Sequence, residues 1–149
     1  MAQTYFGSTL RTGTNALTDT TDGGFVVVMQ TATVTTAAAG TATSVTEVLP
    51  AGSQIIDIFI DTMVDEVVGA GTATAIAATV GTAAAGTQYV SSTDVFAGGR
   101  FIPTFTTAQL AAMADIGTNI NVVLTVDPNG TIVTTQGVYR LTVVYAQKL

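Results

Sequence analysis

Apolar and polar residues alternate over several short stretches of this chain, which is the pattern expected of β-strands with one buried face. The clearest stretches are Phe25–Thr35, Thr43–Leu49 and residues 54–63, all rich in Val, Ile or Thr. Weaker or shorter candidates follow at residues 72–80, 88–92, 100–105, 119–126, 131–135 and 137–147. Strands that recur about every 8–12 residues are typical of an antiparallel sandwich or barrel, so we expect an all-β fold.

Two short motifs predict the structure between candidate strands. Thr106 with Gln109 three residues later forms a capping box, which predicts one helix over residues 107–116 that Gly117 would end. The tetrapeptide DPNG at residues 127–130 predicts a hairpin turn between the strands on either side. Proline fixes φ at its second position, and glycine accepts a positive φ at its exit.

The first 24 residues are polar and rich in Gly and Thr, with few apolar side chains. They lack the basic start and apolar core of a secretory signal. We expect residues 1–24 to form an extended N-terminal arm that becomes ordered against another surface, and residues 25–149 to form a β-sandwich domain. The large side chains of this arm, Tyr5, Phe6 and Leu10, are candidate contacts with a neighbouring copy or with another protein.

The composition excludes several kinds of chemistry. The chain has no Cys and no His, so it cannot assemble a Ser-His-Asp or Cys-His site and lacks the usual ligands of transition metals. We therefore expect no enzyme activity, no cofactor and no metal. A net charge of −6 with four basic residues argues against a nucleic-acid partner. Arg100 and Arg140 lie in candidate strands, and we expect them to pair with acids or to cross an interface.

Charged residues make up only 9% of the chain, against about 25% in an average globular domain. Residues 23–46 and 67–93 contain none, and each stretch is long enough to cross a bilayer. Their content is Thr, Ala and Gly with few Leu or Ile, and Gly interrupts them repeatedly. They fit strands and turns coated with threonine better than a transmembrane helix, so we expect no membrane partner.

Asp57, Asp61, Asp65 and Glu66 are the densest group of acids and the candidates for catalysis or metal binding. In a regular strand, Asp57 and Asp61 share one face about 13 Å apart. Paired glycosidase carboxylates lie about 5–9.5 Å apart, and a shared cation needs closer oxygens still. The favoured interpretation is a solvated strand face that discourages edge-to-edge pairing, with an acid/base or metal site as the alternative.

The same alternation places Ile56, Ile58 and Ile60 on the core side of this strand and Phe59 on the outer side between the acids. An aromatic side chain in that position would pack under the N-terminal arm or contact another chain. Phe59 is therefore a further candidate interface residue.

Three segments carry a resemblance to a known family. They are LPAGSQIIDIFIDTMVDEV at residues 49–67, ATVGTAAAGTQYVSSTDV at 78–95 and the closing YRLTVVYAQ at 139–147. These segments resemble the head decoration (cement) proteins of tailed bacteriophages. In that family an LPAG-type turn opens an alternating strand, a VGT…Y…STDV block follows, and the chain closes on a β-strand. The resemblance covers roughly residues 45–147.

The resemblance implies a jelly-roll-like antiparallel β-sandwich on the outer surface of an icosahedral phage head. Such proteins are often homotrimers that clamp capsid subunits, so the implied partners are the major capsid protein and further copies of this chain. The implied location is the virion, after synthesis in the host cytoplasm. The chain departs from the shortest members in its 1–24 arm, and from many relatives in having Val144 where they carry an acid.

Two rival functions remain. A receptor- or glycan-binding β-sandwich of a virion fibre would normally expose Trp or a cluster of aromatics, and this chain has no Trp. A hydrolase that used Asp57, Asp61, Asp65 or Glu66 would need these acids on adjacent strands rather than along one.

Overall fold

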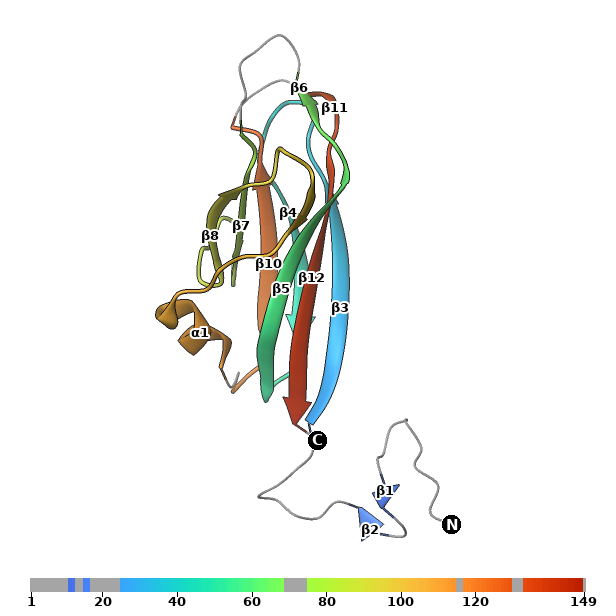
Figure 1. Ribbon diagram of the computed structural model, residues 1–149, viewed down its shortest axis with the longest axis vertical. Helices are drawn as coiled ribbons and strands as arrows, with labels where there is room; N and C mark the ends of the chain where they lie inside the picture. The colour runs from blue at the N-terminus through green and yellow to red at the C-terminus, as the bar shows by residue number, and fades with distance from the viewer. Residues whose placement is uncertain are drawn as a thin grey trace.

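In the computed structural model, two four-stranded antiparallel sheets pack face to face as a β-sandwich (Figure 1). The structure describes residues 11–12, 15–16, 25–68, 75–114, 117–129 and 133–148. The strands of one sheet are, in spatial order, β3 (Phe25–Thr35), β12 (Val138–Lys148), β5 (Ser53–Val64) and β9 (Gly99–Phe101). Those of the other are β4 (Thr43–Leu49), β10 (Ile120–Asp127), β7 (Ala77–Gly81) and β8 (Val90–Asp94).

The remaining elements are small. Two short antiparallel pairs stand apart from the main sheets: β1 (Arg11–Thr12) with β2 (Asn15–Ala16), and β6 (Val67–Val68) with β11 (Val133–Thr135). One helix, α1 (Thr107–Met113), follows β9. No helix in the described part of the chain is long and apolar enough to span a membrane.

The strand order is that of a jelly roll. Counted in chain order, the eight sandwich strands form sheets 1-8-3-6 and 2-7-4-5. The chain changes sheet at every connection except the one between β7 and β8, and it brings the first and last sandwich strands, β3 and β12, side by side. The all-β, jelly-roll-like sandwich with one short helix that the sequence predicts is confirmed.

The core is the layer of side chains between the two sheets. Ile58 and Ile60 of β5, Leu141 of β12 and Leu124 of β10 are at most 1% exposed. Branched aliphatic side chains interdigitate well on a pleated surface, so the Val- and Ile-rich sequence drives this packing. Close packing of this kind fixes the separation and register of the two sheets.

β5 departs from regular alternation at Ile56. Its partner β12 continues without interruption there, whereas β5 has one extra residue, which makes a β-bulge. The bulge turns Ile55 into the core and leaves Ile56 48% exposed. The prediction that Ile56 faces the core is therefore wrong, although Ile58 and Ile60 are buried as expected.

Helix α1 begins as the sequence predicts. The Gln109 amide donates to Thr106 Oγ1 at 3.3 Å, and the Thr106 amide donates to Gln109 Oε1 at 2.8 Å, which completes the capping box. The helix ends earlier than expected, because Met113 is buried in the core and Ala114 is already extended. The prediction that Gly117 ends this helix is wrong.

Residues 127–129 form a local turn, and the hairpin predicted from DPNG does not form. Asp127 Oδ1 accepts a hydrogen bond from the Asn129 amide at 2.8 Å, and Asn129 has a φ of 58°. The flanking strands do not pair with each other: β10 pairs with β4 and β7, whereas β11 pairs with β6. Because both edges of β10 are already occupied, β11 cannot add to it.

Gly81 lies where the connection from β7 to β8 folds back on the sheet. A Cβ atom at this position would lie 2.5 Å from the carbonyl carbon of Gly86 and 2.6 Å from its Cα. The same loop is held over the sheet by the Ala85 amide, which donates to Thr125 Oγ1 of β10 at 2.8 Å. Two backbone segments thus approach closely enough here that only glycine fits.

Replacing Gly81 by alanine should therefore destabilise the fold. We expect Gly81→Ala to lower the free energy of unfolding by about 1–3 kcal/mol, because the loop backbone must move. Gly117→Ala is the matched control, since nothing lies within 4 Å of its added Cβ and its φ is not positive. Denaturant unfolding of both variants measures the difference, and equal stabilities would contradict the close approach.

Candidate interaction surface

The outer face of the β3-β12-β5-β9 sheet carries Phe59 and two of the candidate acids. We call this surface, which points away from the other sheet, the outer face. Residues that are neighbours across the strands form rows on it. One row is Thr31, Thr142 and Phe59, and the next is Thr33, Arg140, Asp61 and Arg100.

Asp61 lies between two arginines in the second row. Its Oδ1 accepts a hydrogen bond from Arg100 Nε at 2.6 Å, and its Oδ2 accepts one from Arg140 Nη2 at 2.6 Å. Further contacts join Oδ2 to Arg100 Nη2 at 3.1 Å and to Arg140 Nε at 3.2 Å. The prediction that both arginines pair with an acid is confirmed. The prediction of a solvated acid is wrong for Asp61, which the two guanidinium groups cover until it is 6% exposed.

These contacts fix the charge of Asp61. The hydrogen bond from Arg100 is the largest influence on its pKa, burial opposes it, and Arg140 reinforces it, so that the pKa falls to about 2. The carboxylate is ionised and its oxygens are taken up by guanidinium groups. It is a structural tie across three strands rather than a general base.

Phe59 occupies the outer face as the sequence predicts. Its side chain is half-buried, and Arg100 Cζ lies 5.4 Å from the centre of its ring, within the range of a cation–π interaction. Tyr5, Phe6 and Leu10, the other candidate interface residues, lie outside the described residues. An interface at Phe59 stays a prediction.

An apolar patch occupies the half of the outer face away from the arginines. We define it as Val27 and Met29 of β3, Val144 of β12 and Ile56 of β5. Val27 is 63% exposed, Met29 66% and Ile56 48%, and Val144 pairs with Met29 across the strands. Contiguous exposed apolar residues of this kind mark sites of interaction. The sequence signal is the unbroken apolar run from Phe25 to Met29, which gives β3 two apolar faces where a surface strand needs one.

The remaining acids do not converge on a site. Asp57 Oδ1 accepts a hydrogen bond from the amide of the next residue, Ile58, at 2.8 Å, and Asp65 is exposed. No group of three or more acids lies within metal-binding reach in the part of the chain that the structure describes. Glu66 does not belong to a solvated face as predicted, because it is only 5% exposed.

Glu66 and Tyr139 both lie against Gly137: a Cβ atom on this glycine would be 3.0 Å from Glu66 Cβ and 2.9 Å from the Tyr139 hydroxyl. Neither carboxylate oxygen of Glu66 has a hydrogen-bond partner of good geometry, and neither does the Tyr139 hydroxyl. Burial raises the pKa of Glu66, and the nearby Thr36 and Tyr139 hydroxyls offset this only in part. A carboxyl group in this setting favours its neutral form and destabilises the fold when it ionises.

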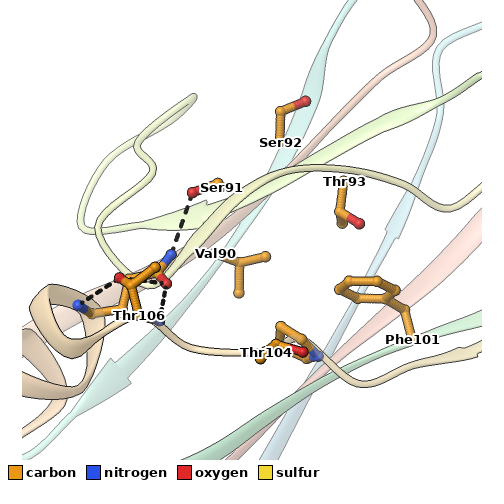
Figure 2. Close-up of a pocket in the computed structure, with 9 residues that line it drawn as sticks. Val90, Ser91, Ser92, Thr93, Phe101, Thr104 and Thr106 are labelled. Atoms are coloured by element: carbon orange, nitrogen blue, oxygen red, sulfur yellow. Dashed lines mark hydrogen bonds between the residues drawn. The ribbon is translucent and has the colours of Figure 1, made fainter.

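A groove of about 210 Å³ lies between β8 and the segment that leads from β9 into α1 (Figure 2). Ser91, Ser92 and Thr93 line one wall, and Phe101 faces them across the hollow. Gln109 Nε2 donates to Ser91 Oγ at 3.4 Å, so one of these hydroxyls is already engaged. The groove is smaller than the roughly 300–1,000 Å³ of typical ligand pockets, and no charged side chain lines it.

Comparison with known proteins gives a likeness of fold. The sequence matches no protein-family model and no curated protein sequence. The structure is similar to a chain in the solved structure of the cyanophage Pam1 capsid asymmetric unit. The TM-score is 0.60 at 18% identity, over 83% of this chain and 86% of that chain. The two chains thus share a fold over most of their length.

Removing the charge of Asp61 should weaken the sheet. We expect Asp61→Asn to lower the free energy of unfolding by about 1–3 kcal/mol, because Arg140 would lose its partner on a half-buried strand face. The folded pKa is below that of the unfolded chain, so the contribution of Asp61 is present above about pH 4 and is lost as the pH falls toward 2. Unfolding followed between these pH values should show a shallower loss of stability in the variant.

The control is Asp57→Asn, on the same face of the same strand, where Oδ1 can still accept from the Ile58 amide. It should change stability by no more than about 0.5 kcal/mol. A wild-type-like stability of Asp61→Asn at neutral pH would show that the charge of Asp61 contributes nothing to the stability of the fold.

Removing the charge of Glu66 should have the opposite effect. The pKa of Glu66 is raised in the folded state, so the penalty is absent below its unfolded value and grows as the pH rises through the folded value. We expect Glu66→Gln to raise the melting temperature at pH 7 and to have little effect near pH 4. Calorimetric scans at the two pH values measure this, and a lower melting temperature at pH 7 would contradict it.

Proposed function

We propose that this chain is a structural protein of bacteriophage heads, a decoration (cement) protein that binds the outer surface of the icosahedral capsid as a homotrimer and stabilises it. The observation that carries the proposal is the shared jelly-roll fold, over most of both chains, with a chain of the cyanophage capsid structure. The sequence segments at residues 49–67, 78–95 and 139–147 support it, because they resemble the decoration proteins of tailed phages.

The outer face has the chemistry that such a role requires. Thr31, Thr33 and Thr35 of β3 are exposed beside the apolar patch. Asp61 and its two arginines are tied to one another at the far end of this face, and Asp57 is the charged residue beside the patch, opposite Val144. The free-energy cost of removing a hydroxyl or aliphatic group from water is lower than that of removing the charged group of Lys or Glu. The part of this face that lies on β3 has no charged residue and can therefore be buried against capsid subunits or other copies at low cost.

Many modest contacts suffice for this function. A homotrimer would present the same surface three times, and attachment through several weak contacts at once is far more durable than one contact alone. The acidic character of the chain, with a net charge of −6, would keep such a protein from binding nucleic acid.

We propose no catalytic activity. Asp61 is held by two arginines, and Asp94 Oδ1 accepts the amides of Ile76 at 3.0 Å and Phe96 at 2.9 Å. These acids act as acceptors that hold the fold.

The test is the copy number of this chain in purified virions, measured by quantitative mass spectrometry against the major capsid protein. We expect a copy number comparable to that of the capsid protein. Absence from the virion would overturn the proposal. A few copies per particle would also overturn it and would favour the alternative, a receptor- or glycan-binding β-sandwich of a fibre, for which the groove beside Phe101 is the place to examine.

A further inference from the structure

Among the described strands each main sheet has two free edges, and three of these four are protected against pairing with another chain. β9 is three residues long and carries Arg100, β8 is five residues long and carries Asp94, and β4 carries Glu47. Shortness and charge are the usual means by which a native edge avoids adding a strand. β3 has neither, because it is 11 residues long and contains no charged residue.

The open edge of β3 is continuous with the apolar patch. Val27 and Met29 project from β3 itself onto the outer face and are the most exposed members of the patch. A chain that paired with this edge would bury both side chains and gain backbone hydrogen bonds at the same time, as in β-strand addition.

Residues 1–24 have the length and the chemistry to cover this surface. They join the sandwich at Phe25, the first residue of β3 and two positions from Val27. The ten residues before β1 would span up to about 35 Å when extended, and a strand of 11 residues is about 36 Å long. The segment supplies Tyr5, Phe6 and Leu10 as apolar contacts and has only three charged residues.

A second copy is the receiver that best fits this segment. Within residues 1–24, the described residues pair with each other, Arg11 with Ala16 and Thr12 with Asn15. Figure 1 shows β1 and β2 beyond the end of the sandwich rather than along β3. These four residues therefore do not pair with β3 of their own copy. Two copies repel each other because each has a net charge of −6. Contact through the uncharged edge of β3 keeps the carboxylates of one copy away from those of the other.

We propose that residues 1–24 of one copy of this chain bind along β3 and the apolar patch of the next copy. The donating and receiving surfaces differ, so the contact is head to tail and closes into a ring when the rotation between copies allows it. A trimer needs a contact of this kind. The inference rests on the homotrimer in the proposed function and names the surface that joins its copies.

Mixed crosslinking of single-cysteine variants tests the proposal in the isolated protein. The chain has no Cys, so each variant carries one defined thiol. Leu10→Cys on a tagged chain is mixed with Met29→Cys on an untagged chain and oxidised mildly. A disulfide between these two variants can form only between copies. We expect several-fold more of this mixed dimer than with Leu110→Cys, which is similarly exposed but lies on α1, away from β3.

The other outcomes overturn the proposal. Equal crosslinking with Met29→Cys and Leu110→Cys would mean that the segment does not recognise the patch. A full-length chain carrying both Leu10→Cys and Met29→Cys that closes on itself, with no mixed dimer, would mean that the segment covers its own sheet. Crosslinking of the segment only to capsid protein, on assembled particles, would name a different receiver.

A second measurement uses mass rather than crosslinking. We expect Met29→Lys to weaken self-association by about tenfold or more in light scattering, because it places a charge in the centre of the contact. Leu110→Lys is the control and should leave the mass unchanged. A monomeric wild-type protein, or an unchanged mass for Met29→Lys, would overturn the proposal. Neither result depends on capsid binding, so failure here is distinguishable from failure of the proposed function.

Discussion

The structure depends on the position of β12 between β3 and β5. Its ladder with β3 runs from Val138 to Lys148 without interruption, and its ladder with β5 covers nearly the same length. Because β12 is the last of the sandwich strands in the chain and β3 the first, this sheet is built almost entirely from contacts between distant residues. Folds dominated by such contacts assemble slowly, since the loop must close before pairing is gained.

The outward surfaces of the two sheets differ in how far other parts of the chain cover them. The outward side of β10 is covered, because the loop after β7 folds over Thr125 and Ser44 contacts the same hydroxyl at 2.9 Å. Thr125 is consequently only 5% exposed. Nothing among the described residues covers Val27 or Met29 on the other sheet in the same way. The chain therefore covers the middle of β10 on one side of the sandwich and leaves the apolar patch on the opposite side uncovered by the described residues.

Local sequence predicts the elements of this fold well and their partners poorly. The bounds of β3 and β4, and the capping box of α1, follow from alternation and from side chains three residues apart. The bulge at Ile56 does not, because a bulge is a mismatch of length between two strands and is visible only when both are paired. The DPNG hairpin fails for a similar reason, since the edges of β10 are taken by strands far away in the sequence.

The candidate surface shows the same division. Alternation places Phe59 and Asp61 together on the outer face, and the two strand cations are expected to find an acid. The sequence could not predict that Asp61 is the partner of both arginines, because Arg100 is 39 positions from Asp61 and Arg140 is 79 positions from it. Glu66 lies two positions after the end of β5, and its burial depends on the close packing around Gly137, which no local pattern records.

The uninterrupted ladder of β3 also determines how the molecule would bear a mechanical load. The chain enters β3 at Phe25, at the end where β12 leaves the sheet. A pull on the preceding segment, directed along the strand axis and opposed by the sandwich, would load all the hydrogen bonds between β3 and β12 in shear at once. A pull across the sheet would instead open them one pair after another. The tensile strength of an assembly joined through this segment would therefore depend on the direction in which neighbouring copies draw it.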